Sequence, residues 1–144
     1  MSTKFGLFLS GGVDSSFIAF LLKKFTNNFF CYSVGVKGSK DLDAAQEVAQ
    51  VLDLELRHAV YSEQEVADFM KQASEIIENP NVVNVSVAAV VLAAVSLAEK
   101  DGIKTFFGGL GSEEIFAGYK RHEHAKDINE ECWCGLKNMW ERDL

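Results

Sequence analysis

Seven consecutive residues near the start of the chain carry many groups that can hold phosphate: Ser10-Gly11-Gly12-Val13-Asp14-Ser15-Ser16. The two glycines can adopt positive φ and let phosphate oxygens approach the backbone, and the three serines add hydroxyl donors. The carboxylate of Asp14 would repel phosphates unless a divalent cation lay between them. The segment therefore predicts a phosphate site that includes Mg²⁺, with Asp14 as a ligand of the metal.

The elements on either side place this segment where it can bind an anion. The apolar run Phe5–Leu9 predicts a buried parallel strand, and Phe17–Leu22 predicts the first turns of a helix. Unpaired N–H groups and the positive end of the helix dipole would then point at the bound group. The segment has neither the lysine of the Walker loop nor the spacing G-x-G-x-x-G. A purely structural turn, with Asp14 as a helix cap, leaves the glycines and serines unexplained, so we favour the phosphate site.

Strands and helices are expected to alternate along the rest of the chain. The expected strands are Lys4–Leu9, Phe29–Val36, Leu54–Val60 and Lys104–Phe107. The expected helices are Ser15–Lys24, a helix capped by Asp41 or Ser39 that runs to Leu52, a helix from the capping box at Ser62 to near Asn79-Pro80, Val85–Lys100, and Asp127–Asp143. This alternation predicts an α/β fold, a parallel sheet with helices on both faces.

Three glycine-containing loops follow expected strands, and each contains a carboxylate: Ser10–Ser16, Gly35–Asp41 and Gly108–Glu114. Ligands of parallel sheets bind beyond the carboxyl ends of the strands. We therefore expect the three loops to meet around one nucleotide.

Composition excludes several function classes. The 144 residues carry a net charge of −7 and no basic cluster longer than two residues, which argues against a nucleic-acid partner. The apolar run Val82–Ala98 is interrupted by polar residues and is shorter than the ~20 residues of a membrane span, so we expect a buried helix and no membrane partner. Three cysteines and no signal peptide indicate a reducing, cytoplasmic location.

The first loop, residues 10–16, resembles the pyrophosphate loop (PP-loop) of ATP-pyrophosphatase domains, which split ATP between its α and β phosphates. Two later segments narrow the resemblance. They are Val34-Gly35-Val36-Lys37-Gly38-Ser39-Lys40-Asp41-Leu42-Asp43-Ala44-Ala45 and Gly109-Leu110-Gly111-Ser112-Glu113-Glu114-Ile115-Phe116-Ala117-Gly118-Tyr119. Together the three resemble the synthetase domain of asparagine synthetase. We expect residues 1–124 to form this domain and residues 125–144 an incomplete helical extension.

The resemblance implies a role for each residue of the three loops. The pyrophosphate would be held by Ser10, Gly11, Gly12, Ser15 and Ser16, and the adenosine would be contacted by Leu9 and by the backbone of Val34. Asp14 and Glu113 would be the catalytic, Mg²⁺-binding carboxylates on the pyrophosphate. Asp41 would lie near the nucleotide, and Gly108 and Gly109 near the ribose and α-phosphate. Two alternatives stay open, a capping role for Asp41 and a core role for Val34.

The implied reaction uses ATP, a small-molecule carboxylate and ammonia. The carboxylate attacks the α-phosphorus, pyrophosphate leaves, and ammonia displaces AMP. Two departures bear on the substrates. Leu110 stands where the family has glutamate, which favours another adenylating ligase as the alternative, and Ser2 stands where the family's glutaminase has its cysteine. Ammonia would then come free or from a separate glutaminase.

The end of the chain offers two more features. A zinc site could be imagined from His122, His124, Cys132 and Cys134, but residues two apart on a helix face different directions, so surface histidines and partly buried cysteines are favoured instead. Trp133 and Trp140 are more apolar than a tail needs and favour an interface, in a homo-oligomer or with a complementing chain. A non-catalytic nucleotide-binding or assembly module is the remaining alternative.

Overall fold

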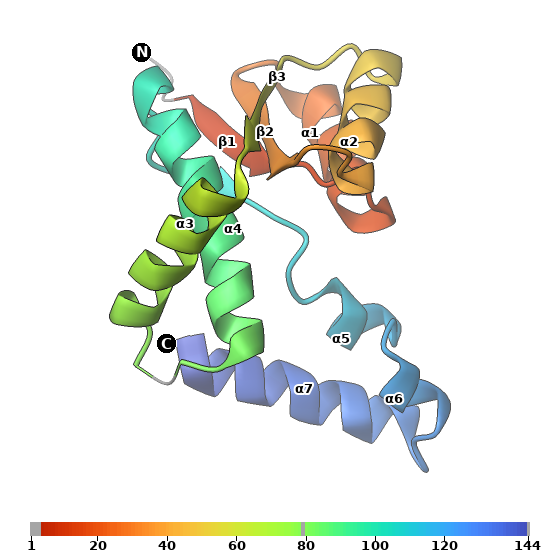
Figure 1. Cartoon of the computed structure of the whole chain (residues 1–144). Coiled ribbons are helices and arrows are strands. Elements are labelled where there is room, and N and C mark those ends of the chain that lie inside the picture. Colours follow the sequence, from red (N-terminus) through yellow and green to blue (C-terminus); the bar gives the residue numbers. More distant parts are fainter. Residues whose placement is uncertain (1–3, 79, 144) are drawn as a thin grey trace. The chain divides into compact units, whose positions relative to one another are not determined.

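The computed structural model describes residues 4–78 and 80–143, and the chain divides after Gly108 into two compact units. The first unit holds the sheet and the PP-loop, and the second holds three helices (Figure 1). Each unit is described by itself below.

The described residues of the first unit contain one sheet of four parallel strands. Its strands are β1 (Phe5–Phe8), β2 (Phe29–Val36), β3 (Leu56–Tyr61) and β4 (Phe106–Phe107), in the spatial order β3-β2-β1-β4. Phe5 pairs with Phe29, Cys31 with Leu56, and Gly6 with Phe106. The expected parallel sheet is confirmed, and the carboxyl end of β1 lies between those of β2 and β4.

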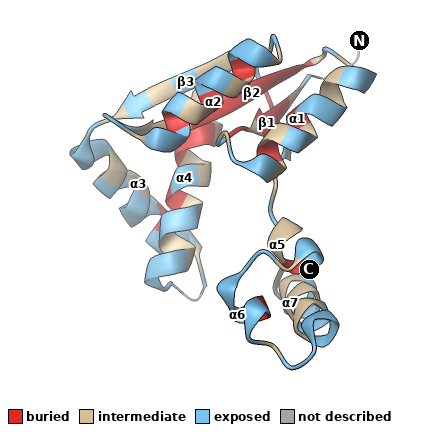
Figure 2. Ribbon diagram, turned by 90° about the vertical axis from the view of Figure 1, so that its right-hand side faces the viewer, coloured by how far each residue is buried: buried red, intermediate tan, exposed pale blue. Residues whose placement is uncertain are grey.

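Helices cover both faces of the sheet, as expected (Figure 1). The helices of this unit are α1 (Val13–Phe25), α2 (Lys40–Val51), α3 (Glu63–Ile76) and α4 (Val82–Ala98). Helices α1 and α2 pack on the face that carries Leu7 and Cys31, and Ala98 of α4 packs on the face that carries Phe30 and Tyr32. Figure 2 shows β1 and β2 as the most buried elements. Buried on both faces, these strands are apolar without alternation.

Capping groups set several helix boundaries. Ser39, not Asp41, caps α2, because its side chain accepts a hydrogen bond from the N–H of Leu42. The predicted capping box of Ser62 and Glu65 is present at the start of α3. Helix α3 ends at Ile76, whereas its predicted end near Asn79 falls on a residue outside the described part of the chain.

Helix α4 differs from the fully buried helix that its composition predicts. It starts at Val82 rather than Val85, because the Asn81 side chain caps it. Four of its alanines are buried, Ala89, Ala93, Ala94 and Ala98, but several of its valines are exposed, with Val83 69% exposed. The segment Val82–Asp101, which contains an 18-residue window with a mean hydropathy of 2.1, is long and apolar enough by length and composition to cross a membrane, a test that core helices of soluble proteins also pass.

The second unit consists of α5 (Ser112–Phe116), α6 (Lys120–Glu123) and α7 (Ile128–Asp143). Arg121 joins them, with ion pairs of 3.7 Å to Glu114 and 3.3 Å to Glu131. Gly135 leaves room for this network, since a Cβ there would lie 2.9 Å from the Glu114 side chain. The chain thus divides into compact units between residues 108 and 109, and the predicted domain boundary between residues 124 and 125 stays a prediction.

Candidate functional site

The PP-loop is held in shape by its own serines. The hydroxyl of Ser15 donates to the carbonyl of Gly12 at 3.2 Å and accepts from the N–H of Ser10 at 3.3 Å. The two hydroxyls of Ser10 and Ser15 lie 3.1 Å apart. These bonds close a tight turn between the end of β1 and the start of α1, so Ser15 is first a structural residue of the loop.

At the amino end of α1, the N–H of Gly12 donates to the hydroxyl of Ser10 at 3.3 Å, and the donors of the first helical turn that follow it have no side-chain cap. Gly12 is the N-cap and offers no side-chain cap, so the N–H groups of the first turn have no partner within the helix. The hydroxyl oxygen of Ser16 is buried and, among the described residues, has no hydrogen-bond partner. Unpaired donors at a helix N-terminus beside an unpartnered buried hydroxyl suit a phosphate group.

Gly11 lets the loop lie directly against α2. Its φ is +77°, and a Cβ added to it would meet backbone and Cβ atoms of Ala44 at 2.5 Å. No other residue fits without moving α2. The glycine was predicted as a phosphate contact, and the structure gives it a second, packing reason.

Asp14 is available for a metal. The residue is half-buried in the first turn of α1, and in the described part of the chain its carboxylate has no hydrogen bond or ion pair. Nearby, the donor set is hydroxyl and carboxylate oxygen, which suits a hard cation such as Mg²⁺. The residues fit the predicted metal, with Asp14 and the phosphates as its ligands.

Val34 presents backbone groups beyond the end of β1. The N–H of Cys31 donates a hydrogen bond on the β3 side of the strand, whereas the carbonyl of Tyr32 accepts one from the N–H of Leu9 on the β1 side. Backbone groups alternate between the two sides along a parallel strand. The N–H and C=O of Val34, two residues after Tyr32, therefore point toward the β1 side. The pairing with β1 ends at Phe8, which leaves these groups of Val34 without a partner strand. This geometry fits the predicted contact with an adenine edge.

Three other predicted residues of the first unit lie around the same strand ends. Leu9 is 1% exposed and packs in the core beneath the loop, and Asp41 is exposed in the first turn of α2. Gly108 follows β4, where a Cβ would lie 3.5 Å from the ring of Phe8. The loops after β1 and β2 and the end of β4 therefore meet, as the topology predicts.

Gly109 and Glu113 belong to the second unit. Glu113 is half-buried, and its carboxylate accepts a hydrogen bond of 3.2 Å from Ser112. Its predicted role opposite Asp14 stays a prediction.

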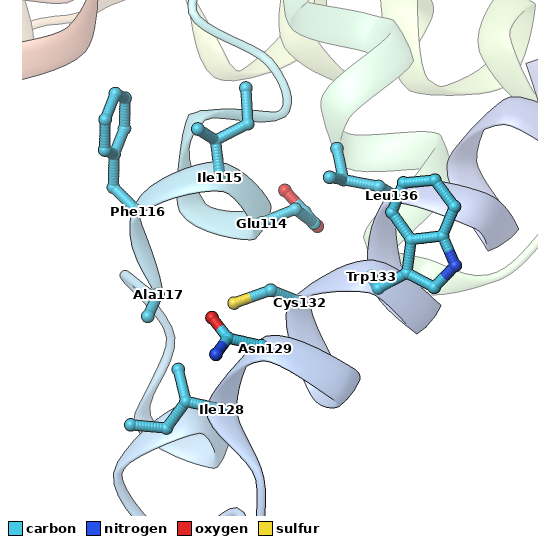
Figure 3. Close-up of a pocket in the computed structure, with 9 residues that line it drawn as sticks. All are labelled: Glu114, Ile115, Phe116, Ala117, Ile128, Asn129, Cys132, Trp133 and Leu136. Carbon is cyan, nitrogen blue, oxygen red and sulfur yellow. The ribbon is translucent and has the colours of Figure 1, made fainter.

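The second unit has a cavity of its own, of about 400 Å³, between α5 and α7 (Figure 3). Glu114 and Phe116 line it from α5, and Cys132 and Trp133 from α7. In the described residues, no group of three or more His, Cys, Asp or Glu side chains is placed to hold a metal ion. The three cysteines are free thiols.

A second cavity, of about 250 Å³, was not predicted from the sequence. It lies beside Val34 at the carboxyl ends of β2 and β3, and α3 and α4 form its other walls. Its residues are scattered from position 34 to position 93, so no local motif marks them.

Comparison with known proteins agrees with this geometry. The profile of the family described as asparagine synthase matches residues 2–142. A putative glutamine-hydrolysing asparagine synthetase of Methanocaldococcus jannaschii is 36% identical over 120 residues, which are 83% of this chain and 22% of that protein. Asparagine synthetase B of Escherichia coli is 31% identical over 144 residues, 88% of this chain and 26% of that protein.

A solved structure has a similar fold. The NH3-dependent NAD synthetase of Campylobacter jejuni, in complex with a nitrate ion, superposes with a TM-score of 0.56 and 25% identity over 81% of this chain and 51% of that one. The chain spans about a quarter of the length of the two asparagine synthetases above. The family profile covers nearly all of it, so the chain belongs to the asparagine synthase family.

Proposed function

We propose that this chain is the ATP-binding part of an amide-forming ligase that activates a carboxylate as an acyl-adenylate. The observation that carries the proposal is the PP-loop, whose free N–H groups, unpartnered Ser16 hydroxyl and unpaired Asp14 carboxylate lie together at the end of β1. Membership of the asparagine synthase family supports the same chemistry.

The proposed reaction has two steps. A carboxylate oxygen of the substrate attacks the α-phosphorus of ATP, and the bond from that phosphorus to the bridging oxygen of the β-phosphate breaks. Pyrophosphate leaves with the electron pair. Ammonia then attacks the acyl carbon, AMP leaves, and the nitrogen loses a proton to give the amide. Positioning and charge neutralisation supply most of such catalysis.

The chain's own residues would bind and orient the nucleotide. The first-turn N–H groups of α1 and the Ser16 hydroxyl would hold the leaving pyrophosphate, and the backbone of Val34 would hold the adenine edge. Mg²⁺, held by Asp14, would neutralise the charge that grows on the leaving group. Gly11 would fix the loop against α2 so that these donors are already in place.

The nitrogen donor and the location are further parts of the proposal. The relatives named above are glutamine-hydrolysing, and we propose that this chain receives ammonia that is free or supplied by a separate glutaminase, in the cytoplasm. Leu110, which stands in place of a glutamate, favours a carboxylate other than aspartate.

The products of ATP test the proposal. The protein is incubated with α-³²P-labelled ATP, Mg²⁺, ammonium chloride and a panel of carboxylic acids that includes aspartate. We expect labelled AMP and, in parallel samples, pyrophosphate. ADP and inorganic phosphate would contradict the proposed chemistry. Tight Mg-ATP binding without turnover for any acid would instead support the alternative of a non-catalytic nucleotide-binding module.

A further inference from the structure

We propose that the 250 Å³ cavity beside Val34 receives an apolar side chain of the carboxylate that the ligase activates. The inference rests on the proposed function, because it assigns the substrate class of that reaction. Its lining comes from the ends of β2 and β3, including Val34 and Tyr61, and from α3 and α4, including Phe69, Val90 and Ala93.

The cavity lies on one face of β2 and the predicted nucleotide contact lies at its edge. Phe30 and Tyr32 pack on the α4 face, so the alternation of the strand directs the side chain of Val34 to that face, where it lines the cavity. The backbone groups of Val34 lie in the sheet plane and point toward β1. One residue can therefore contact the nucleotide through its backbone and a second molecule through its side chain.

The chemistry of the walls selects an apolar group. None of the lining residues is charged. The hydroxyl of Tyr61 donates to the carbonyl of Ala93 at 3.3 Å, and that of Ser86 donates to the carbonyl of Val82 at 2.7 Å. Adenine needs donors and acceptors at its edge, and a second carboxylate needs a counter-charge. The cavity supplies neither, so it disfavours both the base of ATP and the side chain of aspartate.

The volume limits the size of the group. A cavity of about 250 Å³ lies just below the range of sites for drug-sized molecules, roughly 300–1,000 Å³, and suits a short aliphatic chain or one ring. Each methylene that such a chain buries should strengthen binding by about fourfold, until the cavity is full.

Ligand binding tests the inference without requiring turnover. Dissociation constants of acetate, butanoate, hexanoate and 3-phenylpropanoate for the full chain are measured by ligand-observed NMR, with succinate as the polar control. We expect affinity to rise along the alkanoate series and succinate to bind no better than acetate. An equal affinity for all five acids would overturn the inference.

A matched pair of variants locates the site. Val90 lines the cavity and is 58% exposed, and Val87, on the same helix and 48% exposed, does not line it. Val90→Asp should weaken hexanoate binding by about tenfold or more, since a carboxylate at the wall repels the acid and resists burial, and Val87→Asp should change it less than about twofold. Equal effects of the two variants would overturn the site.

Mg-ATP binding, measured by calorimetry in the absence of any acid, separates the two proposals. Loss of alkanoate selectivity with intact Mg-ATP binding overturns only the apolar cavity. Failure of the wild-type chain to bind Mg-ATP overturns the proposed function, whatever the alkanoates do. ATP–pyrophosphate exchange that hexanoate stimulates and aspartate does not would support both.

Discussion

At the scale of single residues, Gly11 and Asp14 of the PP-loop meet different physical demands. Gly11 is constrained by space, because its backbone lies against Ala44 of α2 with a positive φ. Asp14 is not constrained by the fold, because in the described residues nothing pairs with its carboxylate. Substitutions should therefore separate stability at one position from ligand binding at the other.

Replacing Asp14 by asparagine should weaken Mg-ATP binding roughly 10- to 100-fold, the worth of a contact to a charged group of about 1.5–3 kcal/mol. The midpoint of thermal unfolding should move little, since no bond of the fold is lost. Calorimetric titration with Mg-ATP and a thermal scan measure the two quantities. Equal losses of stability and binding would give Asp14 a structural role at the helix terminus instead.

Gly11 and Gly38 form a matched pair of positions at which substitutions should change stability. Both have positive φ, +77° and +79°, but a Cβ on Gly38 would meet nothing within 4 Å. Gly38→Ala should lower the free energy of unfolding by about 1 kcal/mol through backbone strain alone. Gly11→Ala should lower it by about 1–3 kcal/mol more, because the Cβ overpacks the backbone of α2. Denaturant titrations of both variants test this, and similar losses would contradict the packing role.

The loop residues could be predicted from the sequence, because the glycines, serines and aspartate that suit a phosphate site all lie within one short segment. The sequence could not predict the contact of Gly11 with Ala44, which lies 33 positions away and depends on how α2 packs. Nor could it predict that the side chain of Leu9 lies in the core under the loop, and the predicted contact of Leu9 with adenosine stays a prediction.

At the scale of elements, the start of α2 shows how the choice of the capping residue determines which side chain stays available for a ligand. Ser39 and Asp41 were equal candidates in the sequence, since both are good N-cap residues. The structure selects Ser39, whose Cβ also lies 2.8 Å from where a Cβ of Gly35 would be. This leaves Asp41 exposed on the first turn, beside the predicted nucleotide.

Ser39→Ala should therefore lower the free energy of unfolding by about 1 kcal/mol through loss of the cap. Asp41→Asn should change it by less than about 0.5 kcal/mol, because the side chain is exposed. Urea titrations of the two variants make the comparison. A larger loss in the Asp41 variant would show that this carboxylate, rather than Ser39, stabilises the helix terminus.

Helix α4 is an element whose buried side could not be predicted from its hydrophobic pattern. Residues 82–98 are almost uniformly apolar, so the sequence has no polar stripe to indicate which side faces solvent. In the structure, small alanines such as Ala93 and Ala94 are on the buried side of the helix, and larger valines such as Val87 are exposed. Part of the side around Ala93 and Val90 forms the unpredicted cavity.

At the scale of the whole molecule, the parallel sheet and the convergence of its strand ends were predicted from the alternation of strands and helices. The division after Gly108 was not, because residues 108–111 read as one continuous glycine-rich loop. The two carboxylates predicted to bind Mg²⁺, Asp14 and Glu113, thus belong to different units.

The pH dependence of stability reports on the first unit as a whole. Tyr32 in β2 donates a hydrogen bond of 2.7 Å to Asp101, and Asp101 also lies 3.5 Å from Arg57 of β3. Burial, and then the hydrogen bond to Asp101, raises the pKa of Tyr32 above its ordinary value of 10. Burial also raises the pKa of the Cys31 thiol, to about 12 from 9.0.

The upward direction of both pKa shifts determines whether stability rises or falls with pH. A group whose folded pKa is raised binds its proton more tightly in the folded state, so its contribution is full below the unfolded pKa and is lost as the pH rises through the folded pKa. Stability should thus be lost above about pH 9, first through Cys31 and then, above about pH 10, through Tyr32 as well. Each such group adds a slope of up to about 1.4 kcal/mol per pH unit.

Tyr32→Phe tests this coupling of sheet and helix. The variant should be less stable by about 1–2 kcal/mol at pH 7, because Asp101 loses its donor. Above pH 10 its free energy of unfolding should fall less steeply than that of the wild type, by up to one proton's slope. Urea titrations from pH 7 to 11 measure both. Tyr61→Phe is a comparison for the loss at pH 7 only: burial also raises the pKa of Tyr61, but its hydroxyl donates to the neutral carbonyl of Ala93, so the variant leaves no carboxylate without its donor and should lose less stability at pH 7. An unchanged alkaline slope in the Tyr32 variant would contradict the raised pKa of Tyr32, and an unchanged stability at pH 7 would mean that the bond to Asp101 does not help to hold β2 to the turn after α4.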